Sequence, residues 1–315
     1  MISGVAFVFP GQGSQFIGMG REFYEQDPDA RALFDQAGQV LGYDLTALCS
    51  HGPVEQLNLT EYTQPALLTV SVIALRLLQR AGIRPVAVAG HSLGEYTALV
   101  AAEGLAFPDA VEVVRNRGRY MQEAVAEGRG LVCAILGVER SVLADVCRTA
   151  SSLGVVSPAN FNAPGQIVIA GEKAAVEEAV RLAKSKGCRK AIFLPVSVPG
   201  HTTLMQAAAD RLALDLAKVP IHDLAVPLVN NADAKPIRTA TDVRTSLIRQ
   251  LPSSVLWEDS VRVLMGLGMH TLVEVGPGTV LSGLAKRIAS ELRVLNVQDQ
   301  ASLATTIEAL GRCGA

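Results

Sequence analysis

The chain has 315 residues, which is enough for one large α/β domain or about two domains. Hydrophobic residues make up 49% of it and its formal net charge is -2. It can therefore fill a large core, and it lacks the basic surplus typical of proteins that bind nucleic acid or acidic membranes. Its five cysteines are scattered without a Cys-X-X-Cys pair, which argues against a disulfide framework and a zinc site. Because the N-terminus also lacks a signal-peptide pattern, we expect a cytoplasmic protein.

The first apolar run, Val5–Phe9, predicts a parallel strand buried on both faces. A Pro-Gly-Gln-Gly turn follows it, and in α/β sheets the carboxyl end of a strand is where ligands bind. Gln12 is therefore a candidate site residue, and a plain glycine turn is the alternative. Helices are predicted over 22–41, from Val54 to Leu57, and from Pro65 to Ala81. The last is buried and too short to span a bilayer.

Residues 86–103 predict a strand, a tight turn and a helix, with Ser92 at the apex of a Gly-His-Ser-Leu-Gly turn. This is the pattern of a nucleophile elbow, which projects a serine hydroxyl from a strained backbone. Gly90 and Gly94 are expected where strand and helix pack too closely for a side chain. The N-terminal N–H groups of the new helix would suit an oxyanion. An ordinary strand–helix connection is the alternative.

A helix is predicted over 109–125, and Arg117 lies on its apolar stripe. A buried guanidinium needs an anionic partner, since an unpaired buried charge costs several kcal/mol. A structural carboxylate, Glu123 or Asp109, is one candidate. A substrate carboxylate bound by two parallel hydrogen bonds is the other. Without other information, the structural partner is favoured.

The predicted elements from Gly128 onward follow the order β-α-β-β-α-β, which is that of a ferredoxin-like unit. They are strands at 131–136, 154–157, 167–170 and 191–197, with helices at 141–150 and 172–186. We therefore assign 128–197 to an inserted small subdomain, and 1–127 with 198–315 to a large one. The loop over 160–165 has ordinary turn chemistry, although Asn162 could face a cleft between the subdomains.

His201 follows the last of these strands and precedes a predicted helix, which makes it the best candidate for a general base. A helix N-terminus lowers the pKa of a histidine and keeps it able to accept a proton. The alternative is a histidine that faces water. His91 is next to Ser92, but strand alternation points it elsewhere. A strand at 226–229, a buried strand at 271–275 and a helix at 281–289 are predicted in the C-terminal part.

Six segments together resemble the malonyl-CoA:acyl carrier protein transacylases. They are 9–15, 90–95, 117–118, 160–166, 198–201 and 274–278. The resemblance runs from the first strand to about Ile288 and implies an α/β fold. That fold is an α/β-hydrolase-like core with a mainly parallel sheet, plus the inserted ferredoxin-like (β-α-β-β-α-β) small subdomain.

The resemblance also implies a mechanism. Ser92 would attack the thioester of malonyl-CoA with His201 as general base, and the malonyl-serine ester would pass its acyl group to the phosphopantetheine thiol of acyl carrier protein. The backbone N–H groups of Leu93 and Gln12 would stabilise the oxyanion. Arg117 would bind the malonyl carboxylate, in place of the structural partner favoured above. No metal and no permanently bound cofactor are implied.

In this family a backbone carbonyl orients the histidine, and the matching carbonyl is that of Gln250. This agrees with the chain, where no acid stands alone after a core strand between Ser92 and His201. Two positions depart from the family pattern: Gly200 stands where serine is usual, and Ser254 where proline is usual. They leave the backbone course near His201 and Gln250 open.

Acyl carrier proteins are acidic, so the expected partner calls for local basic patches. The candidate docking residues are Lys184, Lys186, Arg189, Lys190, Lys286 and Arg287. Solvated helix faces are the alternative reading of these charges. The implied function is malonyl transfer for fatty acid biosynthesis. The alternatives are a discrete polyketide-synthase acyltransferase, a serine thioesterase or esterase, and a non-catalytic carrier-binding subunit, which Ser92 and His201 argue against.

Overall fold

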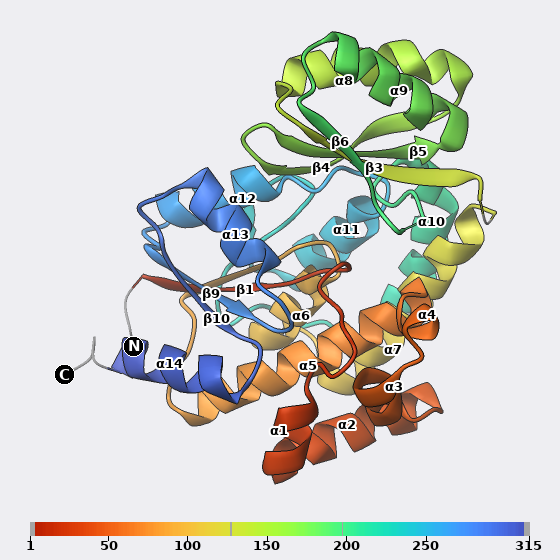
Figure 1. Ribbon diagram of the computed structural model, residues 1–315. Coiled ribbons are helices and arrows are strands. Elements are labelled where there is room, and N and C mark those ends of the chain that lie inside the picture. The colour runs from red at the N-terminus through yellow and green to blue at the C-terminus, as the bar shows by residue number, and fades with distance from the viewer. Residues whose placement is uncertain (1–3, 127, 197, 312–315) are drawn as a thin grey trace.

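The computed structural model describes residues 4–126, 128–196 and 198–311, which form two β-sheets flanked by helices (Figure 1). The first sheet has the strand order β10-β9-β1-β2-β7-β8, parallel except for the β7–β8 pair. Its strands are β1 (Val5–Phe9), β2 (Ala87–Gly90), β7 (Leu228–Val229), β8 (Pro236–Ile237), β9 (Thr271–Val275) and β10 (Arg293–Val297). The protein is thus of the mixed α/β class with a mainly parallel main sheet.

Helices cover both faces of this sheet, as alternate side chains of β1 show. Phe7 and Phe9 pack into the core beneath α5, α6 and α7, whereas Ala6 and Val8 pack into the core beneath α12 and α13. The α-helices are α1 (Arg21–Gln26), α2 (Pro28–Leu41), α3 (Leu45–His51), α4 (Val54–Leu57), α5 (Thr60–Arg80), α6 (Gly94–Ala101), α7 (Phe107–Ala124), α8 (Arg140–Ala150), α9 (Lys173–Ser185), α10 (Gln206–Leu216), α11 (Ala240–Gln250), α12 (Trp257–Gly266), α13 (Val280–Ile288) and α14 (Gln300–Gly311). Burial on both faces explains the unbroken apolar runs of the central strands.

The helix predicted over 22–41 is two helices, because Pro28 interrupts it. A residue before proline is driven out of the helical region, and Asp27 accordingly has φ -127° and ψ 119°. Its carboxylate accepts hydrogen bonds from the N–H groups of Asp29 (3.0 Å) and Ala30 (3.1 Å). Asp27 is therefore the N-cap of α2, with Pro28 in the first turn.

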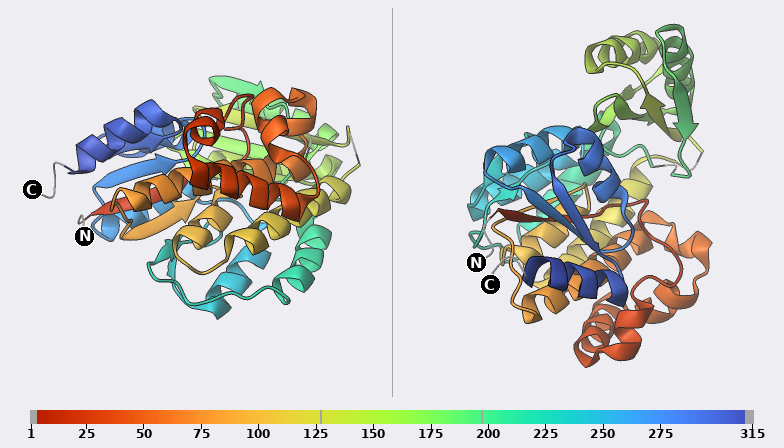
Figure 2. Two further views of the ribbon diagram at one scale, coloured as in Figure 1. Left: turned by 90° about the horizontal axis from the view of Figure 1, so that it is seen from below. Right: turned by 60° about the vertical axis from the view of Figure 1, so that its left-hand side comes forward.

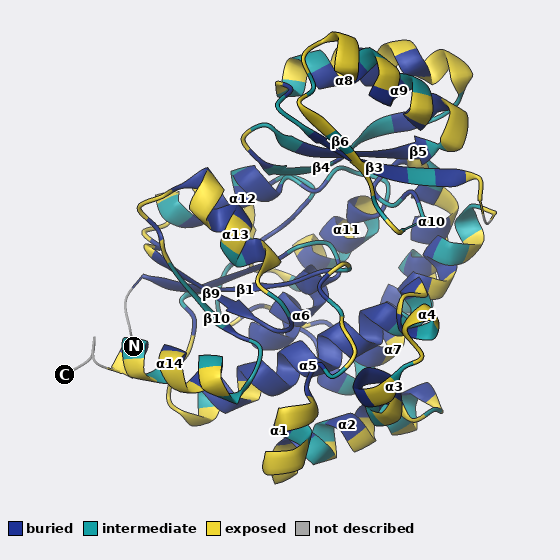
Figure 3. Ribbon diagram, viewed as in Figure 1, coloured by how far each residue is buried: buried dark blue, intermediate teal, exposed yellow. Residues whose placement is uncertain are grey.

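Helix α5 is buried along almost its whole length and packs against α7 (Figure 3). It begins at Thr60, five residues before the predicted start, so Pro65 lies inside the helix and not in its first turn. Pro65 removes one backbone hydrogen bond from α5, and burial of the surrounding side chains maintains the helix through this position. Within the described residues, no helix is both long and apolar enough to cross a lipid bilayer.

The second sheet is antiparallel, with the order β4-β5-β3-β6, and stands to one side of the first (Figure 2). Its strands are β3 (Gly130–Leu136), β4 (Val156–Ala163), β5 (Gln166–Glu172) and β6 (Lys190–Phe193). Helices α8 and α9 cover one face, so the chain order is the expected β-α-β-β-α-β. Residues 127 and 197, at the expected subdomain boundaries, lie outside the described residues.

Strand β4 corrects the prediction that 160–165 is a loop. Asn160 and Asn162 are strand residues, and the turn to β5 is made by Pro164 and Gly165 alone. Asparagine is depleted in strands, so local propensity hid this extension. The expected strand at 191–197 also ends early, because β6 stops at Phe193.

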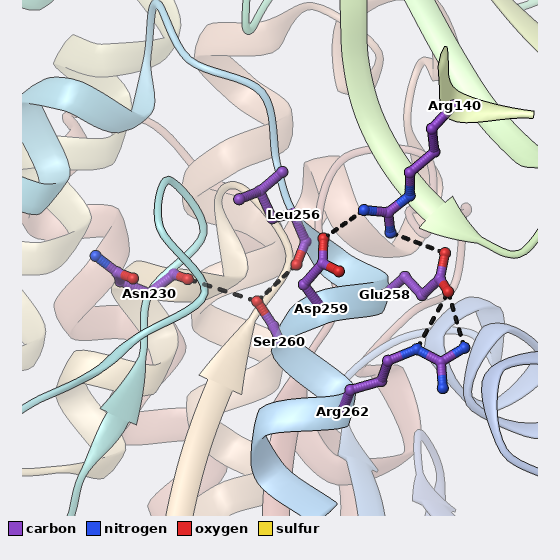
Figure 4. Close-up of polar contacts among 7 residues, drawn as sticks. All are labelled: Arg140, Asn230, Leu256, Glu258, Asp259, Ser260 and Arg262. Atoms are coloured by element: carbon purple, nitrogen blue, oxygen red, sulfur yellow. Dashed lines mark hydrogen bonds and ion pairs between the residues drawn. The ribbon is translucent and has the colours of Figure 1, made fainter. Parts of the chain in front are cut away.

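Two kinds of contact join the second sheet to the first. Arg140, at the start of α8, pairs with Glu258 (2.8 Å) and Asp259 (2.7 Å) of α12 (Figure 4). In addition, Val255 donates to the Ala159 carbonyl of β4 and accepts from the Phe161 N–H, both at 2.9 Å. The segment between α11 and α12 thus pairs with the edge strand of the second sheet.

Candidate active site

Ser92 lies at a sharp turn between β2 and α6 and has φ 53°, the left-handed backbone expected of an elbow. Glycine is required on either side of it. A Cβ on Gly90 would lie 1.9 Å from the Gly94 carbonyl carbon, and one on Gly94 would lie 2.0 Å from the Phe9 carbonyl oxygen. Strand and helix therefore pack as closely as the sequence predicted.

His201 contacts Ser92 directly: its Nε2 is 2.7 Å from the serine Oγ. Its Nδ1 lies 3.0 Å from the carbonyl oxygen of Gln250 and 3.1 Å from that of Ser253. Carbonyl oxygens only accept hydrogen bonds, so this geometry assigns the proton to Nδ1 and leaves Nε2 free to accept the serine proton. The acceptors are two backbone carbonyls in place of a carboxylate.

His201 is 93% buried, with an exposed fraction of 7%. Burial, followed by the positive charge of Arg117, lowers the pKa of His201 to about 3. The imidazole is therefore neutral at physiological pH and fit to act as a base. The sequence prediction attributed such a shift to a helix N-terminus, but α10 begins only at Gln206, after a short 3-10 turn at Thr203–Met205.

Arg117 of α7 is 1% exposed and points at the nucleophile. Its Nη2 donates to Ser92 Oγ (3.1 Å) and to the side-chain oxygen of Gln250 (2.9 Å), and its Nη1 donates to Gln64 Oε1 (2.9 Å). The guanidinium carbon of Arg117 also lies over the ring of Tyr96, 5.4 Å from the ring centroid. Burial lowers the pKa of Arg117.

No carboxylate of the described residues forms an ion pair with Arg117. Of the two structural partners considered from sequence, Glu123 pairs with Arg119 and Arg211 instead, and Asp109 makes no ion pair among the described residues. The Nε of Arg117 is buried without a hydrogen-bond acceptor in the same part of the chain. The hydrogen-bond partners of the guanidinium are thus neutral, and Glu95 acts on its charge only without direct contact.

A cavity of about 110 Å³ lies over Ser92 and His201, between the two sheets. Gln12, His91, Asn160 and Met121 contribute to its walls. A second cavity, of about 280 Å³, shares Gln12, Val196 and Val198 with the first and extends toward α4 and α5. The nucleophile is therefore reached through a cleft that continues beyond the reacting atoms.

His91 lies in this cleft, although strand alternation pointed it away. Its Nε2 is 2.8 Å from Asn162 Oδ1, and its ring packs against Trp257 with centroids 5.5 Å apart. Burial lowers the pKa of His91. The two expected cleft residues thus contact each other, His91 beside Ser92 and Asn162 behind it on β4.

The two candidate oxyanion donors lie at the end of β1 and after Ser92. Among the hydrogen bonds of the described residues, neither the Leu93 N–H nor the Gln12 N–H has an acceptor. The side chain of Gln12 donates to Thr60 Oγ1 at 3.3 Å. The Ser92 N–H, by contrast, already donates to Asn231 Oδ1 at 2.6 Å.

The two departures from the family pattern are accommodated by the local packing. A Cβ at Gly200 would lie 3.1 Å from the Met121 methyl group, the mobile end of a flexible side chain. Ser254 Oγ donates to the Pro158 carbonyl oxygen at 2.6 Å, which adds a link between this segment and β4. With these residues in place, the Gln250 carbonyl still accepts from His201.

The six basic residues considered for docking are all exposed. Arg287 donates to Gln166 Oε1 (2.5 Å), just after the β4–β5 turn. Arg189 lies against Gly137, whose N–H donates to the Gly165 carbonyl of that turn (2.8 Å). Arg189 and Arg287 therefore lie near one turn, with Lys190 and Lys286 next to them in sequence, whereas Lys184 and Lys186 are at the end of α9.

The chain matches the model of the acyl transferase domain over residues 6–310. It belongs to the acyl transferase family. It is 48% identical to the malonyl CoA-acyl carrier protein transacylase of Escherichia coli (strain K12), over 304 residues that cover 96% of this chain and 98% of the relative. The family match spans both sheets of this acyl transferase.

Two solved structures resemble it over at least 98% of their length. A malonyl-CoA:acyl carrier protein transacylase from Xanthomonas oryzae pv. oryzae has a TM-score of 0.95 and 47% identity, covering 98% of each chain. A complex of a type II PKS acyl-carrier protein with its malonyl-transacylase gives a TM-score of 0.95 and 46% identity. The match covers 98% of this chain and 100% of that one. The likeness extends to both the fold and the sequence.

Sequence reasoning missed the support beneath the site of this acyl transferase. Glu95 of α6 is 1% exposed, and burial raises its pKa to about 7. It accepts from the Asn231 N–H and from Gln250 Nε2, both at 2.9 Å. The available signal was an acidic residue inside an otherwise apolar helix, which requires buried donors. The side chain of Gln250 was missed because α11, which it ends, was not predicted.

Proposed function

We propose that this acyl transferase moves a malonyl group from malonyl-CoA to the phosphopantetheine thiol of acyl carrier protein and so supplies fatty acid biosynthesis. One observation carries the proposal. A serine–histidine pair, 2.7 Å apart, lies beside a buried guanidinium that has no carboxylate partner among the described residues. An acyl group that ends in a carboxylate would supply that partner. The names of the relatives point to the same substrate.

The first half-reaction forms an ester on Ser92. Its Oγ attacks the thioester carbon while the hydroxyl proton passes to His201 Nε2. The carbonyl oxygen becomes an oxyanion that the N–H groups of Leu93 and Gln12 stabilise. The C–S bond then breaks, and the sulfur of coenzyme A takes the proton from His201. Malonyl-serine remains.

The second half-reaction reverses these roles. The carrier thiol gives its proton to His201 Nε2 and its sulfur attacks the ester carbon. The C–O bond breaks, and Ser92 Oγ recovers the proton. Throughout, the carbonyl of Gln250 holds the Nδ1–H of His201, and Arg117 holds the malonyl carboxylate by charge-assisted hydrogen bonds.

The same proposal includes the finer architecture. Residues 1–127 and 198–315 are assigned to an α/β-hydrolase-like catalytic subdomain, and 128–197 to a ferredoxin-like small subdomain. The elbow of Ser92 on a mainly parallel sheet supports the first assignment. The order β4-β5-β3-β6 and the two helices on one face support the second. A cytoplasmic location fits the free thiols of the four cysteines in the described part of the chain, Cys49, Cys133, Cys147 and Cys188.

The proposed docking surface is the group of basic residues around the β4–β5 turn: Arg189, Lys190, Lys286 and Arg287. Its location supports the assignment, because Asn162 on the same hairpin contacts His91 in the cleft. An acidic carrier bound there would lie against the hairpin whose strand β4 forms one wall of the cleft. Lys184 and Lys186 would add attraction at longer range.

The deciding experiment is incubation with radiolabelled malonyl-CoA, followed by acid precipitation and by addition of acyl carrier protein. We expect acid-stable label on the protein, its transfer to the carrier, and no label on a folded Ser92→Ala variant. Release of free malonate would identify a hydrolase and reject the transfer. Stoichiometric labelling of Ser92→Ala would reject the serine ester.

A polyketide-synthase acyltransferase is the second candidate, favoured by the structure of a malonyl-transacylase bound to a type II PKS acyl-carrier protein. Both candidates share the chemistry and differ in the carrier. Transfer rates to fatty-acid and polyketide carriers, compared at equal concentration, separate them.

A further inference from the structure

The Gln250 amide links two charged groups beneath the nucleophile. Its Oε1 accepts from Arg117 Nη2 at 2.9 Å, and its Nε2 donates to Glu95 Oε2 at 2.9 Å. Both contacts are direct at these distances, and they are shielded from solvent, since Glu95 and Arg117 are 1% exposed and Gln250 is fully buried. A continuous chain of hydrogen bonds thus runs from Glu95 to the guanidinium beside Ser92.

The orientation of this amide is set by what surrounds it. Nε2 faces three acceptors: Glu95 Oε2, the Ser92 carbonyl oxygen (3.0 Å) and Asn231 Oδ1 (3.4 Å). Among them, only Glu95 ionises, and its carboxylate form accepts hydrogen bonds and cannot donate. A flipped amide would place its oxygen against three acceptors and its NH₂ against Arg117. Glu95 therefore helps to keep the amide oxygen directed at the guanidinium.

Glu95 is itself held in place by donors from two other elements. Asn231, after β7, donates its backbone N–H to Glu95 Oε2 at 2.9 Å, and Ser246 of α11 donates its hydroxyl to Oε1 at 3.4 Å. Both carboxylate oxygens are thus hydrogen-bonded inside the core, as a buried charge requires. These donors hold the carboxyl group of Glu95 beside the Gln250 amide.

We infer that Glu95 is a positioning residue for the acyl-group carboxylate: it fixes the Gln250 amide, which in turn aims the Arg117 guanidinium. The inference rests on the proposed function, because it assumes that Arg117 binds a carboxylate of the acyl group. It assigns Glu95 to acyl-group selectivity and to no step of proton transfer.

The test is the ratio of kcat/KM for malonyl-CoA to that for acetyl-CoA, measured in Glu95→Gln. A neutral amide at 95 keeps the shape but weakens the charge-assisted bond to Gln250, so we expect the ratio to fall about tenfold or more. Glu274→Gln is the matched control. Glu274 is also fully buried and accepts two backbone N–H bonds, from Leu281 (2.9 Å) and Ser282 (2.7 Å).

Two results would overturn the inference. If Glu95 only offsets the charge of Arg117, its neutralisation strengthens attraction for malonyl and the ratio rises. If Glu95 only supports the fold, kcat/KM falls equally for malonyl-CoA and acetyl-CoA, and the ratio stays at the wild-type value. Glu274→Gln would then give the same result as Glu95→Gln. Wild-type labelling by malonyl-CoA in parallel separates these results from a failure of the proposed function.

Two further variants keep the test decisive. Gln250→Met removes the linking amide but leaves the backbone carbonyl that holds His201. If Glu95→Gln does not fold, Gln250→Met takes its place as the test, and the inference requires that it lowers the ratio. In the Arg117→Ala background, Glu95→Gln should have no further effect on the ratio, since both changes disable one unit. An additional fall in that background would show that Glu95 does not act through Arg117.

Discussion

Substitution of Arg117 tests the substrate class most directly, because malonyl-CoA and acetyl-CoA differ by one carboxylate. In the structure Arg117 donates through Nη2 to Ser92 and Gln250 and through Nη1 to Gln64, so a carboxylate that binds both Nη atoms would replace the contact with Ser92 Oγ. Two charge-assisted hydrogen bonds to a substrate carboxylate contribute about 1.5–3 kcal/mol each, or about 3–6 kcal/mol together. Arg117→Ala should therefore lower kcat/KM for malonyl-CoA by about 10²–10⁴-fold.

Acetyl transfer provides the internal comparison. Its kcat/KM should fall much less than that for malonyl-CoA, so the ratio between the substrates is the quantity to measure. Arg117→Lys should restore only part of the loss, because an ammonium group lacks the planar fork. Arg117→Met fills most of the space and controls for the cavity left by alanine. Equal losses for both substrates in folded variants would refute the assignment and make Arg117 a structural residue.

Three further predictions concern the base, its pKa and the carrier. His201→Ala should slow acylation of Ser92 by about 10²–10⁴-fold in single-turnover labelling, and an unchanged rate would exclude it as the base. Below about pH 6.5 an unfolded histidine binds a proton that folded His201 does not bind until about pH 3. The free energy of unfolding, measured with urea, should therefore decrease as the pH is lowered from about 6.5 to about 3, by up to about 1.4 kcal/mol per pH unit. The decrease should be less steep in His201→Gln. Charge reversal at Arg189, Lys190 and Arg287 should raise KM for carrier protein and weaken its salt dependence, and equal changes in KM for malonyl-CoA would reject the docking surface.

The elbow and the central strands were predictable because their signals are local. The glycines around Ser92 and the apolar run of β1 each specify a conformation within a few residues. The start of α5 was missed for the converse reason. Proline usually marks a first turn, and only tertiary burial explains Pro65 inside a helix.

The site was predictable as a set of residue types but not as a network. Gln250 was identified only by resemblance and only for its carbonyl, since α11, which it ends, has no strong sequence signal. Its side chain joins Glu95 to Arg117 only because three helices that are distant in sequence, α6, α7 and α11, meet in the core. Likewise, the absence of an ion pair for Arg117 among the described residues followed from where α7 packs, which periodicity alone does not reveal.

The pairing of Val255 with β4 has a consequence for protein engineering. Residues 250–255 carry both the carbonyls that orient His201 and the backbone that binds the second sheet. A chimera that exchanges residues 128–197 between related chains would set a foreign β4 against the native segment and shift the histidine with it. The smallest exchangeable module is therefore discontinuous in sequence: it comprises the inserted sheet together with the distant peptide after α11.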